Sequence, residues 1–71
     1  SSMKKAESLQ AITQLWMQLP EQDRHTLKFH TFYHDLEQNH PQLLQWKMPQ
    51  GGWRDREVKS HLLSKKLMTI A

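Results

Sequence analysis

The histidines His30 and His34 have a spacing that can support metal chemistry. Four residues apart on a helix, their rings project from one face, and two imidazoles placed in this way can share a zinc ion. A zinc site needs at least three protein ligands. The candidates for the third have no diagnostic spacing and are His40, His61, Asp35 and Glu37. Two histidines on an ordinary polar face of a helix would have the same spacing. No metal site is therefore predicted, although the sequence leaves open whether His30 and His34 bind a metal.

Basic residues gather toward the C-terminal end. Residues 41–71 hold six Lys and Arg against two Asp and Glu, whereas residues 20–40 hold two against four. Lys and Arg spread over a helix can neutralise successive DNA phosphates and release counterions. The basic residues predicted to bind DNA are Arg54, Arg56, Lys59, Lys65 and Lys66. Because Asp55 and Glu57 interrupt this run, a solvated amphipathic helix is an equally open interpretation.

Two of the three tryptophans are candidates for binding a partner. Trp16 falls on a helical apolar stripe and is predicted to be core. Trp46 follows Leu43 and Leu44, so it is either core, a dimer contact or a ligand contact. Trp53 follows a glycine pair, where it is either tucked under a turn or exposed as an anchor.

Catalysis is not expected, because the chain has no cysteine nucleophile and no glycine-rich phosphate loop. No cofactor and no small-molecule substrate are therefore predicted. The absence of cysteine also excludes a disulfide framework, which fits a cytoplasmic protein. No apolar run is long enough to span a bilayer, so no membrane association is expected.

The spacing of apolar residues and prolines predicts an all-α fold, a small four-helix domain. Leu9, Ile12, Trp16 and Leu19 mark one face of a helix over residues 5–18. A central second helix is expected from Pro20 to residue 39, apolar on two sides, with Leu27 opposite its main stripe. A short helix opens at Pro41, and a last helix covers residues 53–68. Ser1 and Ser2 have the character of a tag remnant before a natural start at Met3, which leaves residues 4–71 as one domain.

Two fragments resemble the helix-turn-helix of bacterial sigma-factor region 4 and of response-regulator output domains. Residues 19–24, Leu-Pro-Glu-Gln-Asp-Arg, look like the opening helix of that family, and residues 57–67 look like its recognition helix. The resemblance implies a C-terminal half that docks in the DNA major groove. It places Lys59 and Ser60 at the DNA and Lys65 and Lys66 on the backbone. Between the fragments this chain has prolines and a glycine pair where the family has a short helix and a tight turn.

The sequence thus leaves two functions to compare. The first is a small DNA-binding transcription regulator or accessory protein, which would grip the duplex through its basic last helix. The second is a protein-interaction module, either an oligomeric adaptor, such as a homodimer, or an inhibitor of a larger complex. The tryptophans and the acidic middle segment favour the second function, because they predict apolar surface that a partner covers.

Overall fold

The computed structural model describes residues 4–71, so the expected tag remnant and start at residues 1–3 lie outside the described part. In chain order the elements are α1 (Lys5–Met17), the 3₁₀ turn η1 (Glu21–Asp23), α2 (Thr26–Asn39), the 3₁₀ turn η2 (Pro41–Leu44) and α3 (Arg54–Ser64). Over this range the fold is all-α, as predicted, and its β-type pairing is limited to an isolated bridge between His25 and Thr69. The described chain has three α-helices and not four, because the third predicted helix is only the turn η2.

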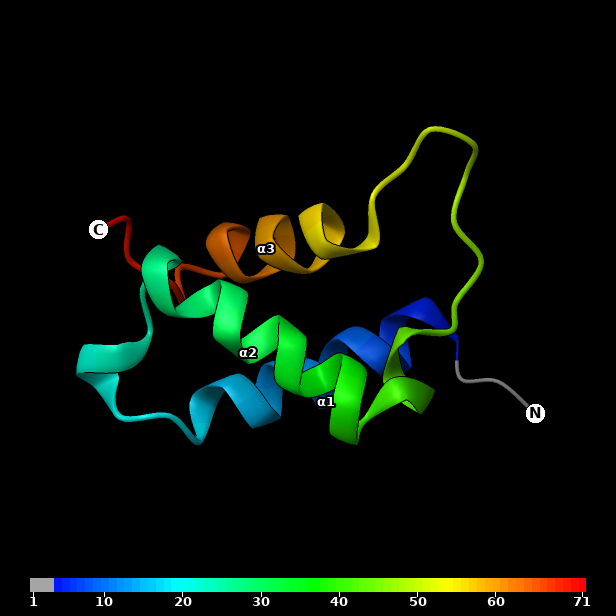
Figure 1. The fold of residues 1–71 in the computed structure, drawn as a ribbon. Coiled ribbons are helices and arrows are strands. Elements are labelled where there is room, and N and C mark those ends of the chain that lie inside the picture. Colours follow the sequence, from blue (N-terminus) through cyan, green and yellow to red (C-terminus); the bar gives the residue numbers. More distant parts are fainter. Residues whose placement is uncertain (1–3) are drawn as a thin grey trace.

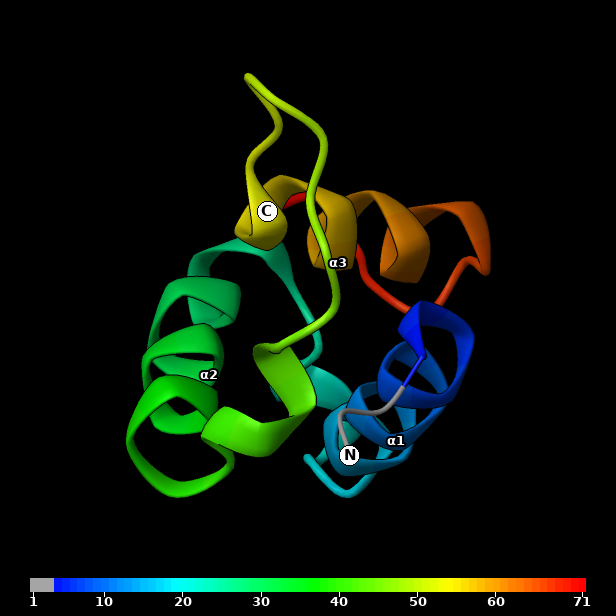
Figure 2. The ribbon, with the colours of Figure 1, turned by 90° about the vertical axis from the view of Figure 1, so that its right-hand side faces the viewer.

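The helices enclose the core from three sides. In Figure 2, α1 and α2 lie on opposite sides of the molecule, α3 lies across them, and η2 fits between α1 and α2. A long connection, residues 45–53, leaves η2 and projects away from the body before α3 begins (Figure 1). This connection turns α3 back along α2, and the two helices form the walls of the site described below.

Trp16 is the centre of the core and is completely buried. Its ring meets that of Phe32 edge to face, with centroids 5.0 Å apart and planes at 80°. This is a favoured geometry for an aromatic pair. The predicted stripe is confirmed within α1, where Leu9 and Ile12 are buried beside Trp16, whereas Leu19 follows the end of the helix and is partly buried. The apolar core residues are Leu9, Ile12, Trp16, Phe29, Phe32, Leu36, Leu43, Trp46, Val58, Leu62 and Met68.

The prediction that the second helix starts at Pro20 is wrong. Residues 21–23 form only η1, and α2 begins after His25, whose backbone is extended (φ −133°, ψ 168°). The His25 imidazole caps the helix, since its Nδ1 accepts a hydrogen bond from the Lys28 N–H at 3.3 Å. The extended backbone of His25 also forms the bridge to Thr69. A contact with the far end of the chain therefore sets this boundary. The prediction that α2 packs on two sides is also wrong, because Leu27, opposite the buried face, is 75% exposed.

The last helix ends at Ser64, earlier than the predicted residue 68. Lys66 follows in the left-handed conformation, with φ 59°. The N–H groups of Lys66 and Leu67 donate to carbonyls of the preceding turn, each at 3.0 Å, which is the pattern of a Schellman stop. The chain then turns inward and buries Met68. Of the apolar residues beyond Ser64, Leu67 and Met68 therefore belong to a tail that packs on the core, whereas Ile70 is exposed.

Candidate interaction surface: the groove between α2 and α3

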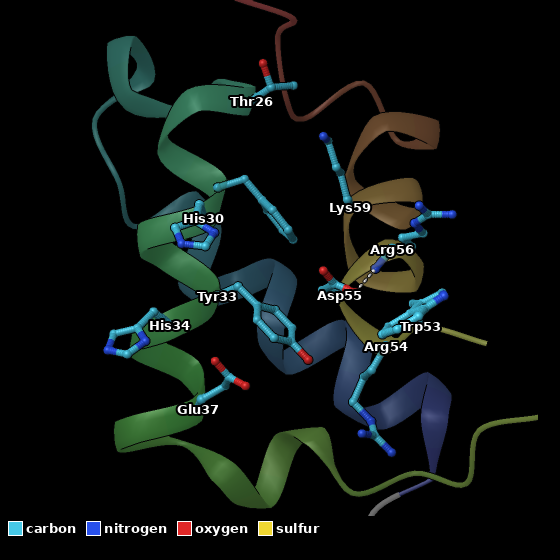
Figure 3. Close-up of a pocket in the computed structure, with 11 residues that line it drawn as sticks. Thr26, His30, Tyr33, His34, Glu37, Trp53, Arg54, Asp55, Arg56 and Lys59 are labelled. Carbon is cyan, nitrogen blue, oxygen red and sulfur yellow. Dashed lines mark hydrogen bonds between the residues drawn. The ribbon is translucent and has the colours of Figure 1, made fainter. Parts of the chain in front are cut away.

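A groove of about 600 Å³ lies between α2 and α3. It is called the α2–α3 groove below. Because the two helices run in opposite directions, the start of α3 lies near the end of α2 (Figure 3). The residues lining it from the side of α2 are Thr26, Phe29, His30, Tyr33, His34 and Glu37. Those from the side of α3 are Trp53, Arg54, Asp55, Arg56 and Lys59.

The aromatic lining of the groove comes first from α2. Phe29 and Tyr33 are one helical turn apart, so their rings lie on one face, with centroids 6.0 Å apart and planes at 34°. Phe29 is buried and Tyr33 is partly buried. Burial raises the pKa of the Tyr33 phenol, and the nearby carboxylates of Glu37 and Asp55 raise it further against the opposing effect of Arg54. Tyr33 therefore keeps its proton at neutral pH and offers a hydrogen-bond donor to a ligand in the groove.

Trp53 adds an exposed aromatic ring at the start of α3. It is 63% exposed, and its backbone is extended as the residue that precedes the helix (φ −120°, ψ 121°). Of the two arrangements left open by the sequence, tucked or exposed, the structure has the exposed one. A large apolar side chain left in water at the edge of a groove is a common feature of binding surfaces.

Trp46, the other tryptophan predicted to bind a partner, lies in the core and is only 4% exposed. Its Nε1–H points to the sulfur of Met48 at 3.1 Å. The Arg54 guanidinium lies over its ring, 5.2 Å from the centroid, and donates to the Trp46 carbonyl at 2.7 Å. Its ring is thus covered on several sides and has no surface to offer, so the assignment of Trp46 to a partner site is corrected.

The six predicted DNA-binding residues do not form one surface. Arg56, Lys59 and Ser60 lie together along a shallow hollow on the outer face of α3. Arg54 is held against Trp46. Lys65 lies on the side of α3 that faces α1, in a hollow that also contains His61 and Gln10. Lys66 lies beyond the helix in the Schellman stop.

The sequence placed these six residues on one continuous helix, and two features of the fold separate them. The helix ends before Lys65 and Lys66, and the Arg54 side chain is used inside the molecule. The two acidic residues within this basic run, Asp55 and Glu57, also have different partners. Glu57 pairs with Lys5 of α1 at 2.7 Å, and the Asp55 carboxylate accepts the Arg56 backbone N–H at 2.9 Å.

His30 and His34 are both exposed on α2 and line the groove. Within residues 4–71, however, there is no group of three or more His, Cys, Asp and Glu side chains that is arranged to hold a metal ion. The third ligand sought in the sequence is therefore not brought to the pair in this part of the chain.

The helices of the described residues are too short and too polar for one to cross a bilayer. Comparison of the chain with protein-family models, with curated proteins and with solved structures gave no match.

Most of the α2 wall of this site could not be recognised from the sequence. Tyr33 has the helical spacing of the core residue Phe29, and His30 stood out only as a possible metal ligand, although Tyr33 and His30 both line the groove. The feature that pointed to the site was local, namely Trp53 between a glycine pair and two arginines. The opposite wall depends on how α3 folds back along α2, which no short-range pattern encodes.

Proposed function

We propose that this chain is a protein-interaction module that binds a partner protein in the α2–α3 groove. The observation that carries the proposal is the exposure of Trp53 at the edge of a groove whose lining includes Phe29 and Tyr33. Tryptophan, tyrosine and arginine dominate the binding energy of protein interfaces, and they do so in pockets from which water is excluded. Trp53, Tyr33 and Arg56 provide this combination in one place.

The size of the molecule supports the same proposal. Over residues 4–71 the core has only eleven buried apolar residues, yet a groove of about 600 Å³ is left open to solvent. A partner that fills the groove would remove the exposed face of Trp53 from water. Burying an aromatic side chain of this size is worth about 1.5–3 kcal/mol.

The experiment is affinity capture with the whole chain and two variants, followed by calorimetry with the purified captured protein. Trp53→Ala removes the exposed ring, and Leu27→Ala removes a comparably exposed apolar side chain that does not line the groove. A partner retained by the parent and by Leu27→Ala, and weakened by about 30-fold or more with Trp53→Ala, is the expected result. If every captured protein binds Trp53→Ala as well as the parent, the proposal is wrong.

A second candidate, binding of duplex DNA, is favoured by one specific observation. Arg56, Lys59 and Ser60 lie together on the outer face of α3, where a convex helix could enter a major groove. The length of the connection before α3 argues against a helix-turn-helix. Nine residues connect η2 to α3, whereas that motif has a turn of about three or four residues. The DNA-binding candidate is therefore limited to these three residues of the six.

Titration of a fluorescein-labelled duplex at several salt concentrations tests this second candidate. Replacing Arg56 and Lys59 together with Ala should lower the slope of log affinity against log salt by about 2, because two phosphate contacts are lost. Lys65→Ala, which removes a charge directly after α3 on the side that faces α1, should leave the slope nearly unchanged. Absence of any binding at about 50 mM salt, where nonspecific contacts are strong, would exclude DNA as the ligand.

A further inference from the structure

The two ends of the α2–α3 groove differ in charge. At the end near Thr26, the α3 wall carries Lys59, and His30 lies opposite (Figure 3). At the other end, the carboxylate of Glu37 lies on the α2 wall, close to the start of α3 (Figure 3). Arg54 also lies there, but its guanidinium is bound to the Trp46 carbonyl. The end near Thr26 is therefore the one with uncommitted positive charge.

Arg56 adds a second cation about one helical turn from Lys59, toward the start of α3 (Figure 3). It is exposed and lines both the groove and the outer hollow of α3, as Lys59 does. In the described residues, the ion pair of α3 is the one between Glu57 and Lys5, on the side of α1. Neither Arg56 nor Lys59 takes part in it. Two cations are thus available to carboxylates of a ligand.

The length of the groove matches a short helix. Its α2 wall runs from Thr26 to Glu37, which at 1.5 Å per residue is about 16 Å, or three helical turns. A groove between two helices with aromatic lining accepts the apolar face of a third helix, whose side chains at positions i, i+4 and i+7 follow the groove. Phe29, Tyr33 and Trp53 would meet such a stripe.

We infer that the ligand of the α2–α3 groove is an acidic amphipathic helix of a partner protein. It is about three turns long, and its apolar stripe packs on Tyr33 and Trp53. Its carboxylates pair with Lys59 at the end near Thr26 and with Arg56 about one turn further along the groove. This inference rests on the function proposed above and names the chemistry of the partner at the same site.

A second copy of the chain is a poorer ligand on the same grounds. α1 has no excess acid, α3 has an excess of one base, and α2, the most acidic helix, exceeds its bases by one carboxylate and already forms one wall of the groove. Charge complementarity with Lys59 and Arg56 thus favours a different protein.

The test is selection of binders from a phage-displayed library of helical peptides with random surface residues. The whole chain is immobilised, and the selected peptides are synthesised and titrated against four variants. Trp53→Ala and Lys59→Glu change the groove. Leu27→Ala and Lys65→Glu are their matched controls, because neither residue lines the groove and Lys65, which directly follows α3, lies on the side that faces α1.

The inference predicts peptides enriched in Asp and Glu beside an apolar stripe. Their affinity should fall about 30-fold or more with Trp53→Ala and about tenfold with Lys59→Glu at low salt, with little change in either control. Peptides of neutral or basic composition that depend on Trp53 but not on Lys59 would overturn the inference and leave the proposed function intact.

Failure of the proposed function itself would look different. If no selected peptide loses affinity with Trp53→Ala, both the proposed function and the inference are wrong. A dimer that dissociates on dilution and is abolished by Trp53→Ala, measured by sedimentation of the chain alone, would assign the groove to a second copy and overturn the inference.

Discussion

The indole Nε1–H of Trp16 donates a hydrogen bond to the carbonyl oxygen of Leu67 at 2.8 Å. The bond joins the last turn of α1 to the tail that follows α3, two segments that are far apart in the sequence. The tail is further fixed by Thr69, whose N–H donates to the Arg24 carbonyl and whose carbonyl accepts from Thr26, both at 2.9 Å. These three bonds close the fold around its core.

Replacing Trp16 with Phe should destabilise the protein by about 2–4 kcal/mol. The change leaves a cavity at a completely buried site and leaves the Leu67 carbonyl without its donor. Urea denaturation measures the loss, and hydrogen exchange should show increased opening of the amides of Leu67 and Thr69. Trp53→Phe, made at an exposed tryptophan, is the control and should change stability by less than about 0.5 kcal/mol. Equal effects at the two positions would contradict the structural role given to Trp16.

Ser8→Ala should stabilise the protein by about 1–2 kcal/mol. Ser8 is completely buried on α1, and its hydroxyl has no hydrogen-bond partner. The substitution removes the desolvated hydroxyl and also raises helix propensity by roughly 0.5 kcal/mol. Ser60→Ala, at an exposed position of α3, isolates the propensity contribution. A gain at Ser8 no larger than the gain at Ser60, by thermal or urea unfolding, would show that the buried hydroxyl is satisfied.

The helix interiors and their buried faces were predictable because they depend on local spacing. Leu9, Ile12 and Trp16 recur with the helical period and are buried, and the same holds for Val58 and Leu62 in α3. The helix ends were less predictable. His25 is held extended by Thr69, and the helical pattern cannot tell an apolar residue that continues a helix from one, such as Met68, that packs after it.

The candidate site was predictable only in part. Trp53 was identified as a possible anchor from its immediate neighbours, and it is exposed. The positive charges were expected to form one cluster, but a cluster depends on where each side chain ends. Arg54 is used by Trp46, and Lys65 lies on the side of α1. The pairing of Tyr33 with the start of α3 requires the path of residues 45–53, which local sequence does not determine.

Lys66→Gly should stabilise the protein by about 0.5–1 kcal/mol. Lys66 has φ 59° in the Schellman stop, a conformation that costs an L-residue about 1 kcal/mol and costs glycine little. The gain is reduced by the greater freedom of glycine in the unfolded chain. Lys65→Gly is the matched control, because Lys65 has φ −88° and glycine brings no relief there. Chemical denaturation of both variants should show changes of opposite sign, and a loss of stability at both positions would contradict the prediction.

Stability should decrease as the pH falls from about 7 toward 5, in part through His61. Burial lowers the pKa of His61, and the positive charges of Lys65 and Lys5 lower it further. Because the folded pKa is below the unfolded one, the unfolded chain takes up a proton first, so this contribution is complete above the unfolded pKa of about 6.5 and is lost as the pH falls through the folded value. His61→Gln should reduce the slope of unfolding free energy against pH in this window, whereas His34→Gln, at an exposed position, is the control. An unchanged slope in His61→Gln would mean that other groups account for the dependence.

Arg54 connects the stability of the core with the position of the proposed anchor. Its guanidinium lies on the Trp46 ring and donates to the Trp46 carbonyl at 2.7 Å, so it fastens the connection of residues 45–53 to the start of α3, where Trp53 lies. Arg54→Lys keeps the charge but lacks the planar group that stacks and donates at once. We expect a loss of about 1–2 kcal/mol in stability and faster hydrogen exchange across residues 46–53, without a change in exchange at α1.

Once a partner that binds the α2–α3 groove is identified, its affinity should fall in Arg54→Lys by less than in Trp53→Ala, because the Trp53 anchor is present but less fixed. If hydrogen exchange across residues 46–53 is as slow in Arg54→Lys as in the parent protein, the connection is held by Trp46 and Met48 without Arg54.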